Sequence, residues 1–282
     1  ACSFMGTAST MQVMAEALGL MLPGTALMPA TAPELKQAAY DAGAQLMKLV
    51  EAGVTAGDIV DMRSFENAIM VHAAISGSTN ALMHIPAIAH EFGIDLDADT
   101  FDRMHRGAHY LLNIRPAGDW PAQYFYYAGG VPRIMEEIKS MLHLDAMTVT
   151  GKTLGENLEE LQKSGYYEKC DEYLKKTGLA RTDVIRSFEK PIGSDGTIAV
   201  LRGNLAPEGA VITYSTDGEN YVTETPVYIG AGVYIVHYQV TKANYNTVTG
   251  SAAVIITARP ITITAEDQSK SFGDNDPAYT WK

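Results

Sequence analysis

The stretch GNLAPEGAVITYSTDGENY, from Gly203 to Tyr221, joins two parts of the chain that differ in composition. All 13 Met lie between Met5 and Met147, whereas residues 213–282 contain no Met, 7 of the 15 Tyr and 11 Thr. Met and Ala suit helical cores, and Thr, Tyr, Val and Ile suit a pleated sheet. The change near Ile212 therefore predicts a boundary between domains of different class.

The whole composition limits the kinds of protein this can be. With 282 residues and 46% hydrophobic content, the chain has material for a packed core and for one large or two ordinary domains. A net charge of −12 argues against nucleic acid or an anionic membrane as the main partner. Cys2 and Cys170 form no CxxC pair and suggest no disulfide scaffold, and no apolar run is long enough for a membrane span.

Before Ile212 the apolar spacing predicts an α/β arrangement that is rich in helices. One helix is expected within residues 9–22, capped by Ser9 or Thr10, with one buried face made of Met11, Met14, Ala15 and Leu18. An amphipathic helix over residues 32–53 has Gly53 as its C-cap. Further helices are expected over residues 79–93, 131–142 and 153–178, and strands over 64–75 and 197–201.

After Thr213 the pattern alternates with a period of two. Residues 227–241, 252–258 and 261–267 predict strands, with turns at Asp217–Gly218, Gly230 and Asn244. We interpret this tail as an all-β, Ig-like antiparallel sandwich segment. Asp267, Asp274 and Asp276 do not have the spacing of an EF-hand loop and fit turn-forming surface acids better than Ca²⁺ ligands.

A short polar run, Ser78-Thr79-Asn80, lies between two apolar segments at a predicted strand-to-helix turn. Such groups at a helix start bind carboxylate or phosphate oxygens, or simply cap the helix. His84 follows one turn later and is either catalytic or an ordinary core residue. The other histidines show no metal-ligand spacing, and the glycines of AGGVP (residues 128–132) fit a turn better than a phosphate cradle.

Five collinear motifs carry a resemblance to a known family. They are ACSFMGTASTMQVMAEALGLMLPGTALMPAT (1–31), NAIMVHAAISGSTNALMHIPAIAHEFG (67–93), YAGGVPRIMEEI (127–138), MTVTGKTLGENLEE (147–160) and GTIAVLRGNLAPEGAVI (196–212). Together they resemble the dihydroxy-acid and sugar-acid dehydratases, which include 6-phosphogluconate dehydratase. The resemblance covers about the first three quarters of the chain and only the middle of the family's enzyme.

The resemblance implies a hydro-lyase that converts a 2,3-dihydroxy acid or an aldonic (sugar) acid into a 2-keto acid, as in branched-chain amino acid biosynthesis. It implies an iron–sulfur cluster, 2Fe-2S or 4Fe-4S, and Mg²⁺ as cofactors. Cys2 matches a cluster thiolate of the family, although a lone Cys is more often buried and inert. The Ser78–Asn80 loop would lie near the substrate. Cys170 matches no motif and is expected to be an ordinary thiol.

The resemblance also sets expectations about what this chain lacks. The other cluster cysteines, most Mg²⁺ ligands and the proposed serine base fall outside residues 1–212 in the family. We therefore expect the chain alone to hold no stable cluster or Mg²⁺ and to be inactive, and we expect the intact enzyme to be a cytoplasmic homo-oligomer. Residues 122–125 read AQYF where many relatives have two acidic residues. That difference favours a divergent sugar-acid branch.

The tail VIITARPITITAEDQSKSFGDNDPAYTWK (254–282) resembles MBG-type bacterial Ig-like repeats of extracellular surface proteins. We accordingly divide the chain into a middle part of the dehydratase domain (1–185), a truncated start of its β-domain (186–212), a partial Ig-like repeat (213–258) and the start of another (259–282). The alternatives are a non-enzymatic surface repeat protein and an artefactual chimera of two fragments. Interruption at Ile212 would leave unsatisfied strand edges over residues 203–212.

Overall fold

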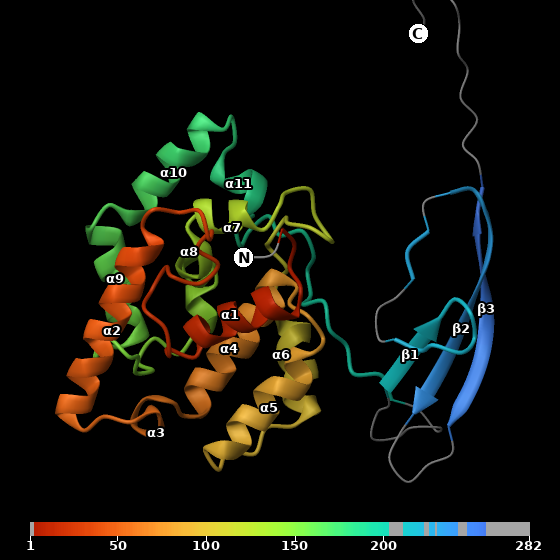
Figure 1. Cartoon of the computed structure of the whole chain (residues 1–282), viewed down its shortest axis with the longest axis horizontal. Helices are drawn as coiled ribbons and strands as arrows, with labels where there is room; N and C mark the ends of the chain where they lie inside the picture. The colour runs from red at the N-terminus through yellow and green to blue at the C-terminus, as the bar shows by residue number, and fades with distance from the viewer. Residues whose placement is uncertain (1–2, 203–210, 223–225, 229, 242–246, 258–282) are drawn as a thin grey trace, which may run out of the picture. The chain divides into compact units, whose positions relative to one another are not determined.

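A computed structural model describes residues 3–202, 211–222, 226–228, 230–241 and 247–257. The chain divides into two compact units, Ala1–Val200 and Leu201–Lys282. The described part of the first unit is helical, and that of the second contains a small sheet (Figure 1). No helix in the described ranges combines the length and the apolar character needed to span a lipid bilayer.

The first unit is rich in helices, as predicted. Its β-type contacts are confined, among the described residues, to isolated bridges. The helices are α1 (Thr7–Ala17), α2 (Leu35–Ala52), α3 (Ala56–Ile59), α4 (Met62–Ile75), α5 (Ala81–Glu91), α6 (Ala98–Gly107), α7 (Gln123–Tyr127), α8 (Gly130–Glu137), the 3-10 turn η1 (Lys139–Met141), α9 (Leu154–Lys163), α10 (Tyr166–Lys176) and α11 (Arg181–Val184).

Helix α4 forms the centre of this unit, where α1, α6 and α8 pack against it (Figure 1). Its side chains are apolar on nearly every side, and Phe65, Ile69 and Val71 are fully buried. The strand predicted over residues 64–75 is therefore wrong. A continuous apolar run suits either a buried strand or a buried helix, and the helical outcome agrees with the N-cap at Asp61, whose side chain accepts backbone hydrogen bonds.

Helix α1 begins earlier than predicted. Gly6 is its N-cap, so Ser9 and Thr10 lie inside the helix rather than capping it. Both are buried, as are Val13, Met14 and Ala17, because one face of the helix packs against α4. The helix ends at Ala17, well before Pro23.

Helix α2 confirms the predicted amphipathic helix and its C-cap. Gly53 has φ 67°, a left-handed conformation that glycine adopts at low cost. None of the side chains of α2 is buried, and several large apolar ones are exposed: Leu35, Tyr40, Leu46, Met47 and Val50.

Residues 153–178 are helical, as predicted, and Gly165 with φ 73° separates α9 from α10. One other prediction needs correction. Residues 197–201 form no strand. Their backbone instead bonds to α6: the N–H of Ile198 donates to Nδ1 of His105, and the N–H of Val200 donates to the carboxylate of Asp102.

The described part of the second unit is one antiparallel sheet in the order β1-β2-β3, formed by β1 (Val211–Ser215), β2 (Gly232–Thr241) and β3 (Val248–Ile256). A sandwich needs two sheets, so the Ig-like reading stays a prediction. In the register Tyr238 faces Gly250, and a Cβ on Gly250 would lie 2.4 Å from the Tyr238 ring. The glycine leaves room for that ring.

The predicted junction between Ile212 and Thr213 falls inside β1, which pairs with β2 over its whole length. β1 is an edge strand of the described sheet. Residues 203–210, where unsatisfied edges were also predicted, lie outside the described residues, as do residues 261–267, the acidic residues of the tail and the turn at Asn244.

Candidate functional site

The candidate site lies where the loop between α4 and α5 meets the start of α1. Ser76 ends α4 in the left-handed conformation, with φ 54°, and turns the chain toward α5. The loop contains the predicted residues Ser78, Thr79 and Asn80. Thr79 is exposed, whereas Ser78 and Asn80 are half-buried. The positive ends of the α1 and α5 dipoles lie toward this region. The first N–H groups of α5 are bonded within the loop, where those of Ala81 and Leu82 donate to the carbonyl oxygens of Ser78 and Thr79.

Side chains of the loop bind α1, and the Ser78 hydroxyl also accepts a hydrogen bond from the N–H of Asn80 at the start of α5, at 3.4 Å. The Asn80 amide Nδ2 donates to Oγ1 of Thr7 at 2.7 Å, and the hydroxyls of Ser78 and Thr7 lie 3.2 Å apart. The backbone N–H of Ser78 donates to Oγ1 of Thr10 at 3.0 Å. Asn80 is the N-cap residue of α5, but its side chain makes no capping hydrogen bond. The simple capping role considered from the sequence is therefore not the one its side chain takes.

Cys2, the predicted cluster ligand, lies outside the described residues. The segment that follows it is held by the loop after α6. The N–H of Met5 donates to the carbonyl of Arg115 at 2.7 Å, and the N–H of Ala122 donates to the carbonyl of Ser3 at 3.0 Å. Ala122 opens the AQYF segment, residues 122–125. This segment therefore contacts the backbone just before α1.

His84 lies on α5, one turn beyond Asn80, and is half-buried. Among the described residues its ring makes no hydrogen bond. A catalytic role for His84 stays a prediction.

A pair of buried histidines near the loop was missed by the sequence analysis. His72 on α4 and His105 on α6 are both fully buried, and Nδ1 of His72 lies 3.1 Å from Nε2 of His105. Burial lowers the pKa of His72 to about 4. Burial and the neighbouring His72 lower the pKa of His105 to about 3. Both rings are therefore neutral near pH 7.

The described residues include no group of three or more His, Cys, Asp or Glu side chains able to hold a metal ion. The described cysteine, Cys170, is half-buried, and burial raises the pKa of its thiol, which disfavours the thiolate that a cluster requires. The described residues do not by themselves fit an iron–sulfur cluster or Mg²⁺.

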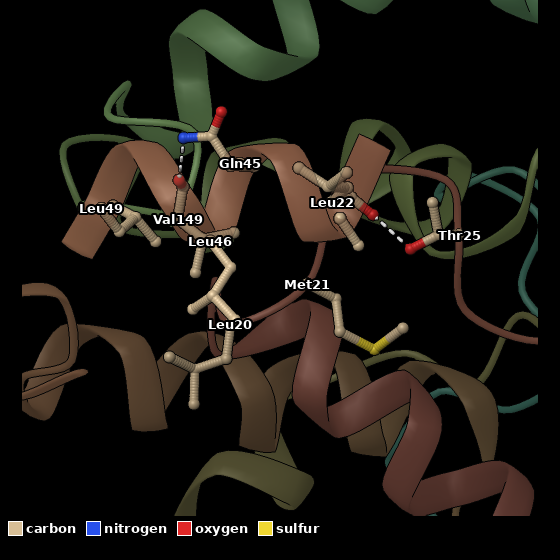
Figure 2. A pocket seen from close by; sticks show the side chains of 9 residues that line it. Leu20, Met21, Leu22, Thr25, Gln45, Leu46, Leu49 and Val149 are labelled. Atoms are coloured by element: carbon tan, nitrogen blue, oxygen red, sulfur yellow. Dashed lines mark hydrogen bonds between the residues drawn. The ribbon is translucent and has the colours of Figure 1, made fainter. Parts of the chain in front are cut away.

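A hollow of about 250 Å³ lies elsewhere, between α2 and the segment after α1 (Figure 2). Its lining is almost entirely apolar: Leu20, Met21, Leu22, Thr25, Ala42, Gln45, Leu46, Leu49 and Val149. Gln45 donates to the carbonyl of Val149 at 2.8 Å, and the Thr25 hydroxyl donates to the carbonyl of Leu22. With no titratable group in its lining, this hollow does not provide acid–base chemistry.

Comparisons with known proteins agree with the resemblance. Residues 1–157 match the family described as dihydroxy-acid/6-phosphogluconate dehydratase N-terminal, and residues 183–259 match its C-terminal counterpart. The second match includes all three strands of the described sheet, which were predicted to belong partly to a surface repeat.

Curated relatives are named dihydroxy-acid dehydratases. The chain is 44% identical over 211 residues to the enzyme of Methanosarcina barkeri, which covers 75% of this chain and 36% of that enzyme. It is 41% identical over 224 residues to that of Methanococcoides burtonii, covering 79% and 38%. It is 40% identical over 216 residues to that of Acetivibrio thermocellus, covering 76% and 36%. The chain thus spans little more than a third of these relatives. Because the first family match alone covers more than half of its residues, the chain belongs to the dihydroxy-acid/6-phosphogluconate dehydratase family.

Proposed function

We propose that this chain is part of a hydro-lyase that dehydrates a 2,3-dihydroxy acid or an aldonic acid to a 2-keto acid. The observation that supports this most directly is the attachment of the Ser78–Asn80 loop to Thr7 and Thr10. It brings the proposed substrate loop to the helix that follows the proposed cluster ligand, Cys2. Residues far apart in sequence thus meet at one place.

In this reaction the C2 proton is removed, the C3 hydroxyl leaves as water, and the enol tautomerises to the ketone. The substrate carboxylate is an anion, and the starts of α1 and α5 favour an anion nearby. We assign Ser78, Thr79 and Asn80 to binding substrate oxygens. Thr79 is the exposed member of the loop and has its hydroxyl available for this contact. Cys2 is proposed as a cluster ligand, and no step is assigned to His84.

The relatives named above are dihydroxy-acid dehydratases, which favours a short branched 2,3-dihydroxy acid as the substrate. The AQYF segment (residues 122–125) favours a sugar acid instead. An assay with 2,3-dihydroxyisovalerate, gluconate and 6-phosphogluconate in parallel distinguishes these branches by which 2-keto acid accumulates.

The chain alone is expected to show no turnover, because it covers little more than a third of the length of its relatives. The test is anaerobic incubation with iron, sulfide and Mg²⁺, followed by an assay for 2-keto acid. Turnover would contradict the expected inactivity.

When the segments that relatives have in addition are supplied from the Methanosarcina barkeri enzyme, activity should appear. Asn80→Ala should then lower kcat/KM about 10- to 100-fold, since one polar contact near the reacting substrate is lost. Glu51→Gln on exposed α2 is the control and should leave kcat/KM unchanged.

A further inference from the structure

The two buried histidines belong to one continuous chain of hydrogen bonds that ends at the candidate loop. Nε2 of His72 lies 3.0 Å from the carbonyl oxygen of Ser78, and Nδ1 of His72 lies 3.1 Å from Nε2 of His105. At the other end, the N–H of Ile198 donates to Nδ1 of His105 at 3.2 Å. All four ring nitrogens therefore have a partner.

The end groups determine which nitrogen carries each proton. A carbonyl oxygen only accepts, so Nε2 of His72 must carry a proton. In a neutral ring Nδ1 of His72 then accepts, and Nε2 of His105 must donate to it. Nδ1 of His105 is left to accept from the N–H of Ile198, which is a donor. This assignment satisfies every partner with both rings neutral. A second proton on either ring would face another donor.

The backbone on both sides lies directly against these rings. A Cβ on Gly77 would lie 2.4 Å from Cδ2 of His72, and a Cβ on Gly196 would lie 2.6 Å from Nδ1 of His105. The N–H of Gly196 also donates to the carbonyl of His105 at 2.6 Å. The rings are thus enclosed by the two segments that they connect, and neither ring can move without moving one of them.

We propose that His72 and His105 are positioning residues, which hold the Ser78–Asn80 loop against α1 and tie its position to the Gly196–Val200 segment. Their role in catalysis rests on the proposed function, because it requires that the loop bind substrate. Their role in placing the loop does not. We call the hydrogen-bonded series from the Ser78 carbonyl through His72 and His105 to the Ile198 N–H the relay. The low pKa values of both histidines agree with a relay that stays neutral across the physiological range.

The first test needs no variant. In the full chain labelled with ¹⁵N-histidine, long-range ¹H–¹⁵N correlation spectra at pH 6 and pH 7.5 report the tautomer of each ring. Two neutral rings protonated at Nε2 are expected. A ring protonated at Nδ1, or a charged ring at pH 6, would overturn the proposal.

Two substitutions at His105 separate the halves of the relay. His105→Gln keeps a donor near the position of Nε2, toward His72, whereas His105→Asn keeps an acceptor near the position of Nδ1, toward Ile198. His105→Asn should therefore speed amide hydrogen exchange at Ser78 about tenfold and alter the His72 ring shifts. His105→Gln should instead speed exchange at Ile198 about tenfold and leave Ser78 near wild type. His90→Gln, at an exposed histidine, is the matched control.

Equal effects of both substitutions at both amides would mean that His105 only fills space, and would overturn the proposal. Titration of the same labelled chain with gluconate and with 2,3-dihydroxyisovalerate tests the other claim. If the relay is observed but no loop resonance shifts with either acid, the proposed substrate loop fails while the positioning role stands. If either acid shifts the loop resonances but the ring tautomers differ from the assigned Nε2-protonated forms, only the positioning role fails.

Discussion

Glu16 shows at the scale of one residue how burial competes with hydrogen bonding. Its carboxylate on α1 accepts hydrogen bonds from the backbone N–H groups of Gly24 and Ala26, at 2.7 and 2.8 Å. These bonds favour the charged form, but complete burial disfavours it more strongly and raises the pKa of Glu16 to about 7. The group that fastens residues 24–26 to α1 therefore changes its charge near neutral pH.

Replacement of Glu16 should change how stability depends on pH. Because the folded pKa is raised above the ordinary value of 4.5, Glu16 contributes most stability below about pH 4.5. That contribution is lost as pH rises toward 7. Between these values the free energy of unfolding should fall by about 1 kcal/mol per pH unit from this group alone. Glu16→Gln should remove this slope in urea denaturation at pH 5, 6 and 7. An unchanged slope in Glu16→Gln would contradict the role, and Glu51→Gln is the exposed control.

The residues of the candidate site were predictable only in part. Ser78, Thr79 and Asn80 are noticeable because they interrupt two apolar segments. His72 is not, because it lies within an apolar run and its partner His105 is 33 residues further along. A buried histidine inside a predicted core segment was the available signal. Its meaning depends on which helix packs opposite, and a single sequence does not contain that information.

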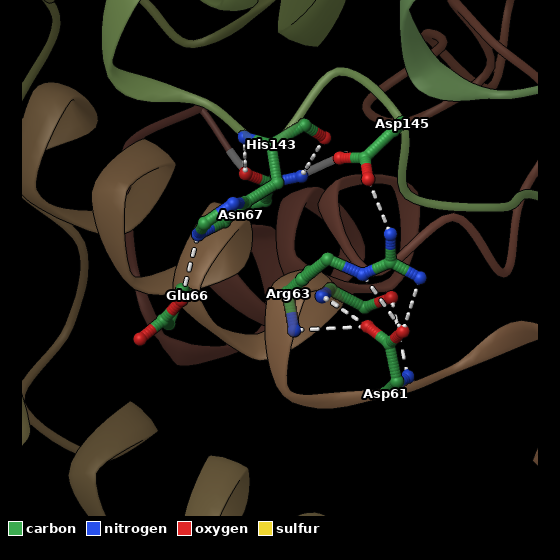
Figure 3. A network of polar contacts seen from close by, with 7 residues as sticks. Asp61, Arg63, Glu66, Asn67, His143 and Asp145 are labelled. Carbon is green, nitrogen blue, oxygen red and sulfur yellow. Dashed lines mark hydrogen bonds and ion pairs between the residues drawn. The ribbon is translucent and has the colours of Figure 1, made fainter.

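At the scale of elements, the start of α4 is fastened by a network of charges (Figure 3). Asp61 accepts hydrogen bonds from the N–H groups of Arg63 and Ser64 and forms an ion pair with the Arg63 guanidinium, which also contacts Asp145. Hydrogen bonding from Arg63 lowers the pKa of Asp61. One turn further, Asn67 exchanges two hydrogen bonds with the backbone of His143. The central helix is thus joined to the loop before α9.

Removal of this cap should destabilise the whole first unit. Asp61→Ala is expected to lower the free energy of unfolding by about 1–2 kcal/mol, because two N–H groups at the start of α4 lose their acceptor. Asp61→Asn keeps an acceptor but not the charge, so its loss should be smaller. Thermal and urea denaturation of the three proteins measure both effects. Equal losses in the two variants would show that the charge, and not the cap, is what matters.

The elements that were predicted well are those with local end signals. Gly53 ends α2 through its own conformational freedom, and the pattern before it repeats at helical spacing. The segment 197–201 looks like a strand by composition, yet its N–H groups bond to His105 and Asp102. The partner of a backbone N–H is a property of the folded chain. Apolar composition alone therefore does not decide between sheet and loop.

At the scale of the whole molecule, the two units divide between Val200 and Leu201. The last backbone contact of the first unit is the bond from the N–H of Val200 to Asp102, at 2.8 Å. The change from Met to Thr and Tyr predicted the division near Ile212 instead. The composition indicates which type of secondary structure follows. The boundary between the two compact units depends instead on which residues contact one another in the folded chain.

Truncation tests this division. A chain ending at Arg202 should keep the amide spectrum of the first unit and unfold cooperatively, because the contacts of residues 196–200 are retained. A chain ending at Ser194 loses those contacts and should unfold at a lower urea concentration. Both are measured by ¹H–¹⁵N spectra and urea titration. Loss of folding in the longer truncation, with a folded full chain, would contradict independent units.

The exposed apolar side chains of α2 should affect how the protein behaves in solution. Leu35, Leu46 and Val50 are exposed in the described part of the chain and present hydrocarbon to water. Surfaces of this kind adhere more strongly in sulfate or phosphate, which are excluded from protein surfaces, and less strongly in urea. Apparent particle size should therefore grow with concentration and with such salts. Hydrophobic-interaction chromatography would retain the chain more than its net charge of −12 suggests.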